Sequence, residues 1–168
     1  MPKGSFRKTL CAPGLLREVR AGFDRIDDTV ASRGLNLTDC LMSGLAVFGL
    51  KYPSLLQFDQ GRNDELVRAN LQSLYGVECA PSDTYLRERL DHVTPAELRY
   101  PFRRLLHLLQ RGKGLEGFEY VDGHYLLSLD GTGYFSSSEV HCEQCCEKHH
   151  RDEKVTYYHQ MLGAVLIH

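Results

Sequence analysis

The stretch Tyr125-Leu-Leu-Ser-Leu-Asp-Gly-Thr-Gly-Tyr-Phe135 decides how the last third of this 168-residue chain folds. Its leucines and its closing aromatic pair predict a buried β-strand with Asp130 at the centre. A carboxylate in such a strand has to be paired, protonated or bound to a cation, because burying an unpaired charge is very unfavourable. The sequence therefore marks Asp130 as a candidate metal ligand. The alternative is that Asp130-Gly131 forms a turn, since Asp-Gly is a common hairpin dipeptide.

Strand and turn signals surround this stretch on both sides. Residues 118–121 and the turn dipeptide Asp122-Gly123 predict a hairpin that leads into the Asp130 strand. A polar loop over about residues 137–154 precedes the apolar segment 155–167, which we expect to be an inner strand of a sheet. Two consecutive strands cannot cover both of their own faces, so we expect this sheet to need further covering elements.

The first two thirds of the chain have the pattern of helices. Apolar residues recur at helical spacing from Leu15 to Ile26, with Pro13 in the first turn. A buried helix is expected from Asn36 or Thr38 to just before Pro53. The remaining expected helices are 63–75, capped by Asn63, then 82–92, entered through Pro81, and a last one that opens at the capping box Thr94-Pro-Ala-Glu97 and ends at Gly112.

The charged, glycine-containing stretch Arg111–Gly117 is the best candidate for a domain boundary. Helical patterns lie before it and strand patterns after it. The sequence therefore predicts an α+β chain with a helical region over residues 1–114 and a β region over residues 115–168.

Composition limits the classes of function. The chain is 42% hydrophobic and 25% charged, as expected of an ordinary globular protein. A formal net charge of −2 gives no overall attraction to nucleic acid, so any DNA contact has to come from a local basic face. No apolar run approaches the length of a signal peptide core or a membrane span, and we expect a cytoplasmic protein that does not contact membranes. In that compartment the six cysteines indicate free thiols or a metal site.

The segment His141-Cys-Glu-Gln-Cys-Cys-Glu-Lys-His-His150 has the composition of a metal site. Cys142 and Cys145 have the C-x2-C spacing that binds one zinc ion. His149 or His150 would add a third ligand and His159 a fourth. The alternative is a solvated loop that carries reduced thiols, because a strong zinc signature has two such pairs and only one is clear here.

The helix pair 63–75 and 82–92 resembles a helix-turn-helix. Arginines on its second helix would contact phosphates or read guanine edges. The alternative is a plain helical bundle with a solvated arginine face, since acidic residues interrupt the basic surface. The candidate DNA contacts are Thr84, Tyr85, Arg87 and Arg89 on the second helix, with Arg103 and Arg104 on the helix that follows.

The segments LLSLDGTGYFSS, HCEQCCEKHH and TYYHQMLGAVLIH together resemble the start of the catalytic domain of bacterial insertion-sequence transposases of the DDE class. The resemblance is close over about residues 120–168 and looser over residues 36–111. It implies an RNase H-like fold, with Asp130 as the first of three acids that bind Mg²⁺. It also implies DNA transposition by phosphoryl transfer, with the terminal inverted repeats of a mobile element as the DNA partner and a homodimer as the complete protein.

Only the first acid of that family has a counterpart in this chain. Glu139 and Asp152 fit no family position for the second or third acid. We therefore expect an N-terminal fragment of a longer transposase, inactive by itself although its parent is a metal-dependent DNA strand transferase. The alternatives are a truncated, non-catalytic DNA-binding regulator of transposon origin and a small zinc-stabilised interaction module.

Overall fold

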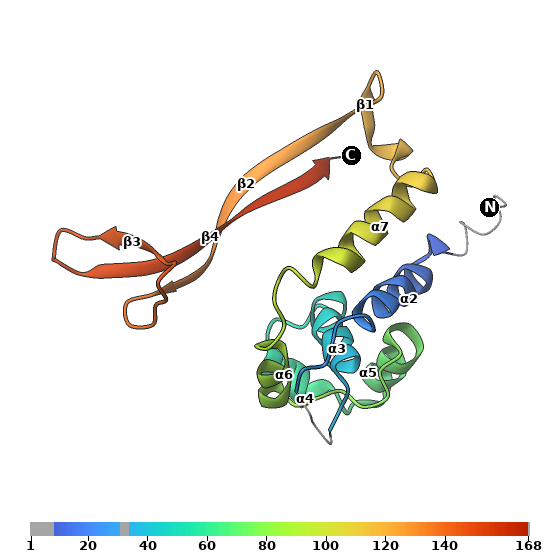
Figure 1. Ribbon diagram of the computed structural model, residues 1–168, viewed down its shortest axis with the longest axis horizontal. Coiled ribbons are helices and arrows are strands. Elements are labelled where there is room, and N and C mark those ends of the chain that lie inside the picture. Colours follow the sequence, from blue (N-terminus) through green and yellow to red (C-terminus); the bar gives the residue numbers. More distant parts are fainter. Residues whose placement is uncertain (1–8, 31–33, 168) are drawn as a thin grey trace. The chain divides into compact units, whose positions relative to one another are not determined.

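The computed structural model describes residues 9–30 and 34–167. The chain divides into two compact units, Met1–Gly114 and Leu115–His168. In the described residues the first unit is helical, and the second contains a four-stranded antiparallel sheet (Figure 1). The chain is therefore of mixed α/β composition, with the helices and the sheet in separate units.

The helices of the first unit fall close to the positions that the sequence predicts. Asn36 caps the second of them, and its side chain accepts a hydrogen bond from the Asp39 N–H at 2.7 Å. Ser82 caps another in the same way by accepting from Tyr85 N–H. The elements are α2 (Ala12–Phe23), α3 (Leu37–Gly49), α4 (Leu55–Gly61), α5 (Glu65–Asn70), the π-helical turn η1 (Leu71–Tyr75), α6 (Asp83–Leu90) and α7 (Arg99–Arg111).

Several details of these helices differ from the prediction. Helix α4 was not expected, and it starts directly after Pro53 because the Ser54 hydroxyl caps it by accepting from Gln57 N–H. The predicted helix 63–75 is capped by Asp64 and not by Asn63. It is α-helical only as far as Asn70 and then widens into η1, which ends at Gly76 in the left-handed conformation, with φ of 67°.

The capping box before α7 forms, but the helix begins later than predicted. The backbone N–H and the hydroxyl of Thr94 both donate to the Glu97 carboxylate, at 2.7 and 2.8 Å. These hydrogen bonds lower the pKa of Glu97. Residues 95–98 form turns, regular α-helix starts at Arg99, and α7 ends at Arg111 before Gly112.

The hydrophobic core of the first unit lies between α2, α3, α4 and η1. Phe58 and Met42 are almost completely buried at its centre. Helix α7 packs against α2, where a Cβ added to Gly22 would lie 2.6 Å from the Pro101 Cβ. A side chain larger than hydrogen is therefore excluded at this crossing of two helices.

The second unit is a long antiparallel ribbon with a short strand added at each end (Figure 1). The predicted hairpin is confirmed, and its turn residues Asp122 and Gly123 have φ of 47° and 75°. A short 3₁₀ turn, η2 (Glu116–Phe118), precedes the strands β1 (Glu119–Val121), β2 (His124–Ser137), β3 (Cys146–His149) and β4 (Val155–Ile167), which lie in the order β1-β2-β4-β3. Strand β3 falls inside the segment that the sequence pattern predicts to be a loop, because it pairs with the start of β4.

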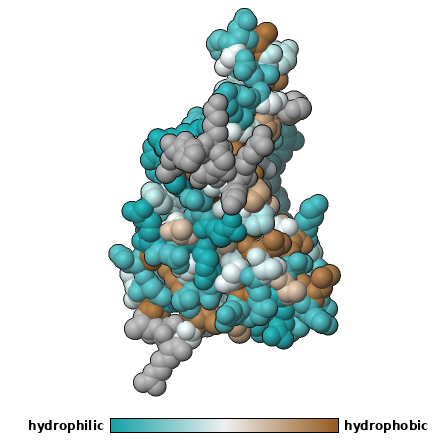
Figure 2. Space-filling view, turned by 90° about the vertical axis from the view of Figure 1, so that its right-hand side faces the viewer, coloured by the Kyte–Doolittle hydropathy of each residue, from teal (hydrophilic) through white to brown (hydrophobic). Residues whose placement is uncertain are grey.

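Asp130 lies within β2, in register with Gly163 of β4, so Asp130-Gly131 is not a turn. The prediction that this strand is buried is wrong, since Leu127 is 51% exposed and Leu129 is 60% exposed. In the described part of the second unit no helix or second sheet covers either face of the ribbon. Apolar side chains of the ribbon consequently remain at the surface. The space-filling view in Figure 2 faces mainly the helical unit, where brown apolar patches lie among hydrophilic side chains.

Among the helices in the described ranges, none combines the length and apolar character that a membrane span requires.

Candidate functional site

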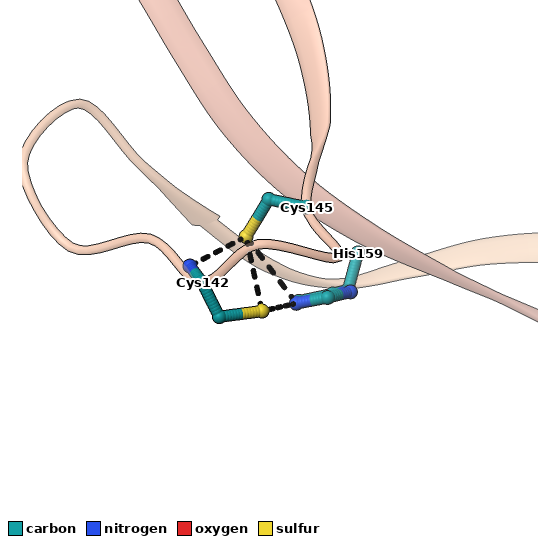
Figure 3. Close-up of side chains that lie close together, drawn as sticks. All are labelled: Cys142, Cys145 and His159. Carbon is teal, nitrogen blue, oxygen red and sulfur yellow. Dashed lines mark hydrogen bonds between the residues drawn. The ribbon is translucent and has the colours of Figure 1, made fainter.

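Three of the predicted metal ligands meet at one point of the second unit. Cys142 Sγ and Cys145 Sγ lie 3.8 Å apart, and each lies 3.3 Å from His159 Nε2. Figure 3 shows the two cysteine side chains converging on the imidazole edge. Cys142, Cys145 and His159 therefore form a group that could hold a metal ion. We call this group the Cys–His triangle.

The local backbone holds the two cysteines in position. Cys145 N–H donates to the Cys142 carbonyl at 3.1 Å, which closes a tight turn. Cys142 N–H in return donates to Cys145 Sγ at 3.3 Å (Figure 3). These two hydrogen bonds keep both sulfurs on the same side of the turn.

The third member of the triangle comes from a strand. His159 lies on β4 opposite Phe135, next to the irregularity in the β2–β4 pairing. Its ring stacks on Tyr134, with ring centroids 5.8 Å apart, and lies at the same centroid distance from Phe135. These two aromatic rings restrict the orientation of the imidazole, so its Nε2 is held toward the cysteine turn.

The other predicted zinc ligands do not join the triangle. His149 Nε2 lies 3.1 Å from a Glu147 carboxylate oxygen, and His150 Nε2 lies 2.9 Å from the Thr156 hydroxyl. Both are therefore removed from the ligand set. The reason is strand geometry, because β3 pairs residues 146–149 with β4 and takes the two histidines away from the cysteine turn. None of the six cysteines forms a disulfide.

Asp130 is the second candidate site. Its side chain is exposed, and within the described chain no hydrogen bond or ion pair joins its carboxylate to another residue. Glycines surround it, since Gly131 follows it, Gly163 faces it, and a Cβ added to Gly131 would meet nothing within 4 Å. The carboxylate is therefore open to solvent. It belongs to no group of three metal-ligating side chains among the described residues, so the structure by itself defines no magnesium site here.

Arg89 was predicted to contact DNA, and this prediction is wrong because its side chain is buried. Its side chain is only 4% exposed, and its guanidinium binds the Asp28 carboxylate at 2.5 Å and the Val30 carbonyl at 3.2 Å. The hydrogen bond between Arg89 and Asp28 raises the pKa of Arg89 and lowers the pKa of Asp28. Arg89 thus anchors the segment after α2 and is not available to read a base.

The other candidates on α6 are more accessible but partly engaged. Tyr85 is half-buried, and its hydroxyl donates to the Leu35 carbonyl at 3.3 Å. Thr84 is exposed, and its hydroxyl donates to the Asp83 carboxylate at 3.1 Å. Arg87 is 62% exposed, with Asp83 at 3.9 Å on the same face of the helix. With Arg89 buried, the accessible charges of α6 are Arg87, Asp83 and Glu88, so the surface of this helix is not basic.

Helix α7 presents a more continuous basic surface. Arg99, Arg103, His107 and Arg111 are all exposed and recur every four residues, so they lie along one face. We call them the α7 stripe. Arg104 lies off this face and donates from Nε to the Glu18 carboxylate at 3.3 Å. Helix α7 contains no acidic residue. Sequence reasoning missed His107, although its i,i+4 spacing from Arg103 is the signal that places it in the stripe.

The first unit also has an apolar groove of about 530 Å³, which sequence reasoning did not anticipate. Residues of α3 form one side, including Phe48, whose side chain is 80% exposed. Phe102 of α7 lines it as well and is 53% exposed.

Comparison of the chain with models of protein families, with curated proteins and with solved structures finds no match. Its function is therefore inferred from the residues and their geometry.

Proposed function

We propose that this chain belongs to a DDE-class transposase, in which a helical unit binds DNA and a strand of an RNase H-like domain carries the first metal-binding acid. The observation that carries the proposal is the position of Asp130. It lies in the middle of a long antiparallel strand, and its carboxylate is exposed and unpaired within the described residues. The sequence around it, LLSLDGTGYFSS, resembles the start of the catalytic domain of those enzymes in combination with the downstream segments HCEQCCEKHH and TYYHQMLGAVLIH.

An unpaired carboxylate among glycines suits a role as an oxygen ligand. In enzymes that cleave DNA with two metal ions about 3.5–4 Å apart, the ions stabilise the attacking and leaving oxygens of the phosphodiester. Mg²⁺ prefers such oxygen ligands, and Asp130 would supply one of them. One acid cannot hold two ions, so the proposal requires further acids and predicts that Asp130 alone supports no strand cleavage.

DNA binding in this proposal is assigned to the α7 stripe and not to α6. Successive positions of the stripe lie about 6 Å apart along the helix, so its three arginines and the imidazole N–H donor of His107 form a line that can follow phosphates. The absence of acidic residues from α7 leaves that line without repulsion from its own helix. Arg87 on α6 has Asp83 beside it, and Arg89 is buried.

Binding of duplex DNA by the full chain, measured by fluorescence anisotropy over a range of salt concentrations, tests this interface. Replacing Arg99 and Arg103 together by Gln should weaken binding and reduce the slope of log K against log salt by about 0.9 for each phosphate that is no longer neutralised. Arg87→Gln is the matched control and should have a smaller effect. The assignment would be ruled out if the DNA affinity did not depend on salt concentration. It would also be ruled out if a chain beginning at Leu115 kept the full DNA affinity.

The role of Asp130 needs a separate measurement in a cleavage-competent transposase that contains this sequence. Asp130→Ala should abolish Mg²⁺-dependent nicking and leave DNA affinity unchanged, because the carboxylate would contact the metal and no recognition element. Normal cleavage by the variant would show that Asp130 is not a catalytic ligand.

A non-catalytic DNA-binding regulator is the second candidate, and the single acid favours it. It would share the salt-dependent binding but would never require Asp130. A zinc-stabilised interaction module, the third candidate, would depend on metal at the Cys–His triangle and would bind no DNA.

A further inference from the structure

The Cys–His triangle has the dimensions of one face of a zinc tetrahedron. Zn–S bonds of about 2.3 Å and Zn–N bonds of about 2.0–2.1 Å, at tetrahedral angles, place two sulfurs about 3.8 Å apart and a sulfur and a nitrogen about 3.6 Å apart. The corresponding distances here are 3.8 Å between Cys142 Sγ and Cys145 Sγ, and 3.3 Å from each sulfur to His159 Nε2. The sulfur pair matches, and the two sulfur–nitrogen distances agree within a few tenths of an ångström.

Within its described residues, the second unit also has no apolar core of the kind that stabilises a small domain without a metal. Among the described residues the buried hydrophobic side chains lie in the first unit, apart from Leu115 at the start of the second. A unit of this size that buries so little needs another source of stability, and a structural metal is a common one. The triangle lies where a crosslink would act, since it joins the turn between β2 and β3 to the middle of β4.

We propose that Cys142, Cys145 and His159 bind one zinc ion, which fastens the segment between β2 and β3 onto β4. As the two sulfur–zinc bonds form, the two thiol protons pass to solvent. No fourth protein ligand lies with the triangle among the described residues, and Cys142 is exposed. The fourth position of the ion is therefore open to water or to another small donor. This inference rests on the triangle alone and is independent of the proposed transposase function.

The ligand set is tested by the metal content of the full chain. The protein is purified with a reducing agent, and its zinc is measured by inductively coupled plasma mass spectrometry. We expect about one zinc ion per chain. Cys142→Ser, Cys145→Ser and His159→Asn should each weaken zinc binding by more than about 100-fold, since each removes a direct ligand. His159→Cys should retain zinc, because it replaces one ligand by another, and this variant separates loss of a ligand from loss of folding.

The matched controls are Cys146→Ser, His149→Asn and His150→Asn. These residues are close in sequence and have ligand chemistry, but they lie outside the triangle. All three variants should keep their zinc. Equal loss in a control, retention in Cys142→Ser, or a Cys142–Cys145 disulfide in the reduced protein would overturn the proposal.

Two further readouts address the open position and the crosslink. With Co²⁺ in place of zinc, the thiolate charge-transfer absorption should appear, and it should change when a small thiol is added to occupy the fourth position. An unchanged spectrum would show that a protein group already fills that position. Removing zinc with a chelator should speed amide hydrogen exchange in residues 138–146 and 155–160 but not in α3, and equal exchange with and without metal would contradict the crosslink.

Discussion

At the scale of single residues, burial separates side chains that look equivalent in the sequence. Arg87 and Arg89 lie on the same short helix, two residues apart, and both were candidates for DNA contact. Arg89 lies in the protein interior against Asp28, whereas Arg87 is 62% exposed. A charged side chain is stable in the protein interior only when it is paired with an opposite charge. The location of Arg89 therefore gives it a structural role.

Arg89→Ala should therefore destabilise the first unit without acting directly on DNA. Removing one partner of a buried ion pair costs roughly 3–5 kcal/mol, and we expect about 2–3 kcal/mol here because the Asp28 side chain keeps 38% exposure and can be hydrated. Urea unfolding followed by circular dichroism measures the change. Arg87→Ala, the matched control, should cost less than about 0.5 kcal/mol.

The ion pair between Arg89 and Asp28 makes the free energy of unfolding depend on pH. Asp28 has a pKa lowered from 3.8 by its hydrogen bond to Arg89, so its contribution to stability is complete above that unfolded value. The contribution disappears as the pH falls below 3.8 and through the lower pKa of the folded state. The unfolding free energy of the wild-type chain should fall in that acid range more steeply than that of Arg89→Ala, and parallel curves would show that the pair contributes nothing.

At the scale of elements, the contact between α2 and α7 depends on a glycine. Gly22→Ala would place its Cβ 2.6 Å from the Pro101 Cβ and 3.1 Å from the Pro101 Cα, so relief of this contact requires a shift of the Pro101 backbone. We expect a loss of about 1–3 kcal/mol, as for other overpacked sites. Gly44→Ala on α3 is the matched control, because its Cβ would make an ordinary contact at 3.6 Å with Leu90.

Gly44→Ala should leave the unfolding free energy unchanged or raise it by up to about 1 kcal/mol, since alanine favours the helix more than glycine does. Thermal unfolding of both variants gives the comparison. If Gly22→Ala is as stable as the wild type, α2 and α7 do not pack as closely as described.

The ribbon of β2 and β4 shows how far apolar pattern alone determines a strand. Backbone hydrogen bonds join the two strands along the register that starts at the pair Leu126↔Ile167. Its leucines nonetheless stay exposed, because pairing satisfies only the edges of a strand and leaves both faces open. Exposed apolar faces and unpaired edges of this kind promote association.

At the scale of the whole molecule, the division at Gly114 predicts different behaviour of the two units. A chain ending at Gly114 should stay folded, because the hydrophobic core lies within the first unit, and it should be more soluble than the full chain. Sedimentation and hydrogen exchange on both chains test this. Amides of β2 around Asp130 should exchange quickly while those of α3 are protected, and a monomeric full chain with a protected ribbon would contradict the prediction.

The sequence by itself was sufficient for much of the local structure of this protein, although it did not predict α4, the π-helical turn η1 or β3. Caps such as Asn36 and Ser82, the Asp122-Gly123 turn and the period of apolar residues determined the main helices and the two long strands, because these signals act between residues close in the chain. The C-x2-C spacing in the sequence likewise predicted that Cys142 and Cys145 lie together as candidate metal ligands. Only the tertiary structure decided which histidine joins them, that Arg89 is buried, and that the Asp130 strand is exposed. Each of these depends on which distant segments come together, and that is determined by strand register and packing, which no local pattern specifies.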